Sequence, residues 1–101
     1  MSERIRIPAS FPDAGVAGRR VVITGAGRGL GELLAHAFSA AGATVALVAR
    51  TERDLKAVAA ALPGESLVFA GDVRDEEFNL AVATGCAAEL GGVDAWICNA
   101  G

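Results

Sequence analysis

The chain has 101 residues, a net charge of −3 and 52% hydrophobic residues. This length allows at most one domain, and the negative charge gives no electrostatic basis for binding nucleic acid or an anionic membrane. No segment approaches the roughly 18 apolar residues of a membrane-spanning helix, and the N-terminal residues show no apolar signal-peptide core. We therefore expect a cytoplasmic protein.

Residues 1–18 form a lead-in with two prolines and no clear hydrophobic period. A β-branched apolar run follows and predicts a first strand over 19–24. The next apolar residues recur at helical spacing, which predicts a helix over 30–41 that ends at Gly42. The stripe expected to face the core consists of Leu30, Leu33, Leu34, Ala37, Phe38 and Ala41.

The rest of the chain alternates in the same way. Strands are predicted over 44–48, 66–70 and 93–98, and helices over 51–62 and 75–90. Thr51 is a candidate N-cap, with Asp54 at the fourth position of a capping box. The order β-α-β-α-β-α-β predicts parallel strands joined by right-handed crossovers. The predicted fold class is α/β, the N-terminal portion of a Rossmann-like, doubly wound parallel sheet.

A glycine-rich turn directly follows the first predicted strand. Its glycines are Gly25, Gly27, Gly29 and Gly31. Glycine lets the backbone take positive φ and lets a ligand approach closely. The helix that begins near Leu30 directs unpaired N–H groups and its positive dipole end at this turn, an arrangement suited to a pyrophosphate. The alternative is a tight strand-to-helix turn without a ligand.

Three motifs in chain order resemble those of the short-chain dehydrogenase/reductase family. The turn reads T-G-x-x-x-G-x-G, Asp72-Val73 follows the third predicted strand, and Asn99-Ala100-Gly101 follows the fourth. Cys98 departs from the first Asn of the family's N-N-A-G motif. The resemblance covers residues 19–101 and implies a partial NAD(P)-binding domain. The cofactor-binding residues that it implies are Thr24, Gly25, Gly29, Leu30, Gly31, Asp72, Val73, Asn99, Ala100 and Gly101.

The end of the second predicted strand favours NADP(H) over NAD(H). An NAD-binding fold holds an acid there for the ribose 2′-hydroxyl, whereas an arginine accommodates a 2′-phosphate. This chain has Ala49 at that position, followed by Arg50, and Arg28 lies in the glycine turn. Arginine matches phosphate oxygens well. The alternative is that both arginines are solvated surface residues.

The family's catalytic groups, a Tyr and a Lys four residues apart with a Ser upstream, have no counterpart in this sequence. The chain has no tyrosine, and its only lysine is Lys56. No catalytic residue is therefore assigned. We expect the N-terminal part of a short-chain dehydrogenase/reductase whose parent protein transfers hydride between a nicotinamide and an alcohol or carbonyl substrate, and forms homo-oligomers as this family commonly does.

Two other classes of protein remain as alternatives. One is a stand-alone nucleotide-binding or regulatory module without turnover, or a decayed truncated product. The other is a methyltransferase, which the missing acid at Ala49 disfavours. In the first alternative the fourth strand should be covered, whereas in a partial domain it forms an apolar edge that favours association.

The remaining reactive side chains predict no further site. Cys86 and Cys98 form neither a C-x-x-C pair nor a metal-ligand pattern. Both are expected to be buried thiols. His36 has no cysteine or histidine near it in the sequence, and we expect a solvated helix residue.

Overall fold

The computed structural model describes residues 15–99. Ala100 and Gly101, predicted to bind the cofactor, lie outside this part, as does most of the 1–18 lead-in. The elements in order are β1 (Arg20–Thr24), α1 (Gly29–Ala40), β2 (Thr44–Ala49), α2 (Glu52–Ala61), β3 (Ser66–Ala70), α3 (Glu76–Leu90) and β4 (Ala95–Ile97). This order confirms the predicted alternation.

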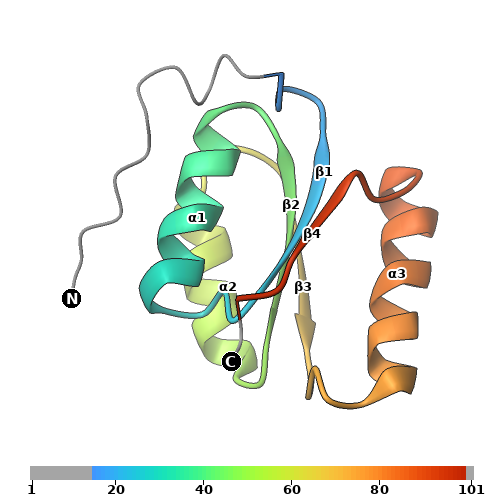
Figure 1. Cartoon of the computed structure of the whole chain (residues 1–101). Coiled ribbons are helices and arrows are strands. Elements are labelled where there is room, and N and C mark those ends of the chain that lie inside the picture. The colour runs from blue at the N-terminus through green and yellow to red at the C-terminus, as the bar shows by residue number, and fades with distance from the viewer. Residues whose placement is uncertain (1–14, 100–101) are drawn as a thin grey trace.

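The four strands form one parallel sheet in the order β3-β2-β1-β4. Ile23 of β1 lies opposite Leu47 of β2 and Ile97 of β4. Figure 1 shows α1 and α2 on one face of the sheet and α3 on the other. The chain adds strands outward from β1 in one direction and then returns to its other side, so the fold is the predicted doubly wound α/β sheet.

The alternation of side chains along the central strands builds two separate cores. Val21 and Ile23 face α1 and α2, where Leu55 packs against them. Val22 points to the opposite face and joins a cluster with Val82 of α3. A parallel sheet covered on both faces requires apolar residues on both sides of its inner strands, which explains the continuous apolar runs of β1 and β2.

The buried face of α1 differs in part from the predicted stripe, of which Leu34 and Phe38 do pack against the core. Its buried residues are Gly31, Ala35 and Ser39. Leu30 and Leu33 are each 40% exposed. A side chain on Gly31 would collide with the carbonyl of Gly25, so the small residues bring the helix backbone close to β1. Close approach on the small-residue face turns these two leucines outward and corrects the expectation from periodicity.

The last strand is shorter than predicted and lies at an edge of the sheet. β4 covers Ala95–Ile97 and pairs only with β1 among the described residues. Cys98 follows it and is exposed, which corrects the expected buried thiol. Cys86 on α3 is buried as predicted, and this burial raises the pKa of its thiol.

The start of α2 corrects the predicted capping box. Thr51 is the N-cap residue by position, but its side chain makes no capping hydrogen bond. The Asp54 carboxylate accepts instead from Arg28, with Nη2 and Oδ2 3.2 Å apart. His36 on α1 is half-buried, and is therefore less exposed than the solvated helix residue that we expected.

Candidate functional site

The loops that follow β1, β2 and β3 meet at one end of the sheet and enclose a cleft of about 460 Å³. The loops are tied together because Ala26 N–H donates to the Val48 carbonyl at 3.1 Å and Gly71 N–H to the Ala49 carbonyl at 2.9 Å. The lining residues are Gly25, Gly27, Arg28, Ala49, Arg50, Thr51, Asp54, Gly71, Asp72, Val73 and Arg74. The carboxyl ends of strands at a topological switch point are where α/β sheets bind ligands.

The glycine turn uses its glycines for two different reasons. Gly25 and Gly29 have φ values of +66° and +60°, in the left-handed region that favours glycine. Gly31 has no such angle; it lies directly against the Gly25 carbonyl and has no room for a Cβ. The turn therefore has the positive-φ backbone geometry that the sequence predicts, and in addition a close helix–strand contact at Gly31 that was not predicted.

The two helices that begin at the cleft have N termini without a side-chain cap. Neither Arg28 at the start of α1 nor Thr51 at the start of α2 makes a capping hydrogen bond. On α3, by contrast, the Asp75 carboxylate accepts from Glu77 N–H at 3.0 Å. The first N–H groups of a helix have no intrahelical partner, so α1 and α2 present donors and a positive dipole end that suit an anion.

Thr24 and Asn99 tie the end of β4 to the glycine turn. The buried Thr24 hydroxyl donates to the Ile97 carbonyl at 3.3 Å and accepts from Asn99 N–H at 2.9 Å. The Asn99 side-chain amide donates to the Gly25 carbonyl at 3.3 Å. The predicted site residues that do not line the cleft are Thr24, Gly29, Leu30, Gly31 and Asn99. They form the turn and the β1–β4 side next to the cleft.

The two arginines predicted for a phosphate do meet at this cleft, but each contacts a carboxylate. Arg28 Nη2 lies 3.2 Å from Asp54 Oδ2, and Arg50 Nη2 lies 3.4 Å from Asp72 Oδ2. Both arginine side chains are largely exposed, at 85% and 67%. Exposed ion pairs of this kind are weak, so an anionic ligand can compete for either guanidinium.

Arg74 is a member of the site that sequence reasoning missed. Its guanidinium contacts Asp72, with Nη2 2.8 Å from Oδ2. This hydrogen bond is the main cause that holds the pKa of Asp72 well below its usual range, and the Arg74 backbone N–H contributes as well. The available signal was the position of Arg74 directly after Asp72-Val73. Gly27, Thr51, Asp54 and Gly71 also line the cleft without having been assigned to it.

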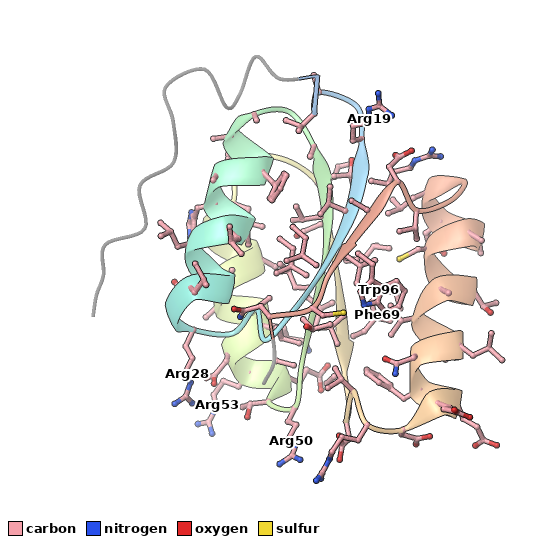
Figure 2. The ribbon with its side chains drawn as sticks, in the orientation of Figure 1. Arg19, Arg28, Arg50, Arg53, Phe69 and Trp96 are labelled. Atoms are coloured by element: carbon pink, nitrogen blue, oxygen red, sulfur yellow. The ribbon has the colours of Figure 1, made fainter. Side chains whose placement is uncertain are left out.

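Arginines and carboxylates are mixed at this end of the molecule, where Arg28, Arg50 and Arg74 line the cleft together with Asp54 and Asp72. Figure 2 shows the side chains of Arg28, Arg50 and Arg53 at the cleft end of the sheet, and Arg19 at the opposite end. Arg53 makes no ion pair with any carboxylate of residues 15–99. The cleft therefore combines backbone donors with arginines, which is chemistry for a phosphorylated ligand.

The part of the chain that the structure describes shows neither a candidate metal site nor a candidate membrane-spanning helix. No group of three or more His, Cys, Asp or Glu side chains there could hold a metal ion. None of the described helices has the length and apolar character needed to cross a membrane.

Comparison with known proteins matches the chain to one family. The family model for short chain dehydrogenase matches residues 19–101. Glucose 1-dehydrogenase of Gluconobacter oxydans (strain 621H) is 38% identical over 99 residues, which cover 94% of this chain and 37% of that protein. L-xylulose reductase of Mesocricetus auratus is 45% identical over 65 residues, 64% of this chain and 26% of that protein.

Solved structures share the architecture. The L-sorbose reductase of Gluconobacter frateurii, crystallised with NADPH and L-sorbose, superposes with a TM-score of 0.84 at 34% identity, over 88% of this chain and 35% of that one. A short-chain type dehydrogenase/reductase from Mycobacterium marinum gives 0.80 at 38% identity, over 85% and 36%. The matched part of the chain thus spans between 26% and 37% of the length of these proteins.

Proposed function

Because the chain belongs to the short-chain dehydrogenase family, we propose that it is the NADP(H)-binding portion of an oxidoreductase. The parent reaction is reversible hydride transfer between the nicotinamide and an alcohol or carbonyl substrate. In this proposal residues 19–101 are a partial Rossmann domain that follows a lead-in at 1–18. The proposal also includes a homo-oligomeric parent protein in the cytoplasm.

The observation that carries the choice of NADP(H) is the charge at the end of β2. Ala49 lines the cleft where an acid would bind a ribose 2′-hydroxyl, and Arg28, Arg50 and Arg74 line the same cleft. A 2′-phosphate there would accept charge-assisted hydrogen bonds from Arg50 and Arg28. The L-sorbose reductase of similar fold was solved with NADPH, which supports the same choice.

The proposal assigns the remaining parts of the cofactor to the glycine turn and to the two loops beside it. We assign the pyrophosphate to the turn formed by Gly25, Gly29 and Gly31, next to the uncapped N terminus of α1. Thr24 and Leu30 flank this turn. Asp72 and Val73 line the cleft on the β3 side, where we place the adenine. Asn99 is assigned to the cofactor ribose on the β4 side, together with Ala100 and Gly101 beyond the described residues.

The chemical step needs groups that these 101 residues do not contain. The sequence has no tyrosine, so the proton donor of the family's reaction would have to lie outside residues 1–101. The alternative function, a nucleotide-binding module without turnover, predicts cofactor binding with no carbonyl reduction. Assaying NADPH oxidation with carbonyls and NADP+ reduction with alcohols in the full-length protein encoded by the gene separates the two.

The cofactor assignment is tested by Arg50→Asp in that full-length protein. We expect NADPH affinity to fall by about tenfold or more, because the variant loses a charge-assisted hydrogen bond and adds a negative charge. NADH affinity should stay the same or rise. Dissociation constants from isothermal titration calorimetry measure both.

Arg53→Asp is the matched control, since it makes the same charge change at the same end of the sheet outside the cleft lining. It should alter the NADPH/NADH ratio much less than Arg50→Asp. An unchanged ratio in Arg50→Asp means that the phosphate assignment is wrong.

A further inference from the structure

The Asp72 carboxylate is shared by two arginines of the cleft. Arg50 makes one long contact with it, 3.4 Å from Nη2 to Oδ2. Arg74 makes four hydrogen bonds, from its backbone N–H at 2.9 Å, from Nε to both oxygens at 3.1 and 3.2 Å, and from Nη2 at 2.8 Å. Asp72 is therefore held mainly by Arg74, and Arg50 is the weaker partner.

This sharing bears on the binding of a 2′-phosphate. A phosphate monoester carries nearly two negative charges at neutral pH. A phosphate that bound Arg50 would compete with Asp72 for the guanidinium and would be repelled by the carboxylate if that carboxylate were left without a counter-charge. Arg74 keeps its own contacts with Asp72, so Arg50 can leave without exposing an unpaired anion.

The other arginine–carboxylate pair of the cleft, Arg28 with Asp54, has no second cation on its carboxylate among residues 15–99. Asp54 accepts from Arg28 alone, at 3.2 Å, and no other cation of residues 15–99 contacts it. If Arg28 moved to a ligand, Asp54 would lose its counter-charge. Of the two predicted phosphate ligands, Arg50 is therefore the one that can be released at the lower electrostatic cost.

We infer that Arg74 is a positioning residue for selection of the 2′-phosphate: it holds Asp72 and thereby frees Arg50 to bind the phosphate. This inference rests on the proposed NADP(H) function. It assigns Arg74 no direct contact with the cofactor; the side chain acts through Asp72.

The test compares two nucleotides that differ by the 2′-phosphate, adenosine 2′,5′-bisphosphate and 5′-AMP, titrated calorimetrically into the full-length protein. We expect Arg74→Gln to lower the affinity ratio of the bisphosphate to 5′-AMP by about fivefold. Arg74→Lys should recover part of the loss, because it restores the charge without the planar fork. A general loosening of the loop would weaken both nucleotides equally and leave the ratio unchanged.

A double-mutant cycle shows whether Arg74 acts through Asp72. In an Asp72→Asn background no carboxylate competes for Arg50, so adding Arg74→Gln should leave the ratio unchanged. Arg53→Gln is the control; its small effect on the ratio should be the same in both backgrounds, since Arg53 has no ion pair with Asp72.

The outcomes separate this inference from the proposed function. A wild-type protein that binds neither nucleotide, or that shows no preference for the bisphosphate, overturns the NADP(H) proposal and this inference with it. A clear preference that Arg74→Gln leaves intact overturns the inference alone. A loss that persists in the Asp72→Asn background also overturns it, because Arg74 would then be a direct phosphate ligand.

Discussion

Gly29 and Gly31 show how neighbouring residues of one turn can be constrained by different physics. A Cβ on Gly29 would meet nothing within 4 Å, but its φ of +60° is unfavourable for other residues. A Cβ on Gly31 would meet the backbone of Gly25, which cannot move without breaking the turn. The first constraint is conformational and the second is steric.

We expect Gly31→Ala to be much more destabilising than Gly29→Ala. The steric collision should cost about 3 kcal/mol or more in free energy of unfolding, whereas the backbone conformation at Gly29 should cost about 1 kcal/mol. Chemical denaturation of the two variants and the parent measures both values. Equal losses would contradict the close α1–β1 approach in the structure.

At this scale the sequence predicted residue types well and pairings poorly. Gly25, Arg50 and Asp72 do line the cleft, and they could be selected because their chemistry and their position after a strand are both visible in the sequence. The contact of Arg74 with Asp72 was not predicted, because it depends on the conformation of the loop between β3 and α3. Cys98 was misassigned because the predicted strand ran past Ile97, where β4 ends.

β1 and β4 are joined at their amino ends by an ion pair. Arg20 and Asp94 contact each other through Nε and Oδ2 at 2.9 Å and Nη2 and Oδ1 at 3.1 Å. The Arg20 backbone N–H also donates to the carboxylate at 2.7 Å. These contacts, led by the side-chain hydrogen bond, lower the pKa of Asp94 to about 2. The clamp holds the short edge strand beside β1.

This clamp predicts an acid-dependent loss of stability. The folded-state pKa of Asp94 lies below its unfolded value of about 4. The stabilisation is therefore complete above about pH 4 and is lost as the pH falls toward 2. Asp94→Asn should lower the melting temperature at neutral pH and flatten its decline between about pH 4 and 2, as measured by circular dichroism.

Glu89→Gln provides the comparison for this pH dependence, because Glu89 is exposed on α3 and makes no ion pair with the other residues of 15–99. It should leave the acid decline close to that of the parent. A parent-like decline in Asp94→Asn would mean that the clamp does not contribute to the acid transition.

The order of the elements and the parallel pairing of the strands were predictable, whereas the buried face of α1 was predictable only in part. Every helix and strand appeared in the predicted order, because alternating apolar runs and glycine stops mark them clearly. The buried face of α1 was predicted only in part. Leu34 and Phe38 pack against the core as expected, but hydrophobic periodicity favours large residues and did not show that the helix also packs through Gly31, Ala35 and Ser39. Close packing of a helix on a strand selects small residues that periodicity treats as weak signals.

Across the whole molecule, burial decreases from the centre of the sheet to its edges. β1 and β2 are buried along nearly their whole length, whereas β3 is half-buried and β4 covers only three residues. Local opening is easiest where few apolar contacts hold the backbone. In the described sheet, the backbone of β1 and β2 should therefore open less readily than that of the edge strands β3 and β4.

We expect hydrogen exchange to follow this gradient. In a preparation of the 101-residue chain, amides of β1 and β2 should exchange at least about tenfold more slowly than those of β4, as measured by mass spectrometry with peptide resolution. Equal protection of β4 would contradict an open edge and would mean that another copy of the chain covers it.

The fold as a whole could be predicted from the sequence because its local patterns all indicate the same architecture. Apolar strands, helices of matching length and a glycine turn after β1 all specify a doubly wound sheet. The cleft was predictable in outline for the same reason, since parallel strands end at one edge. Its ion pairs were not, because exposed side chains are oriented by weak local contacts.

The opposite placement of the Arg20–Asp94 clamp and the arginine cleft has an evolutionary consequence. The residues of the clamp lie at the amino ends of the strands, and the arginines that we propose for cofactor selection lie in loops at the carboxyl ends. Substitutions such as those at Arg50 or Arg74 thus leave the clamp untouched. Ligand preference in this lineage can drift while thermal tolerance is retained, so selection acts on the two properties separately.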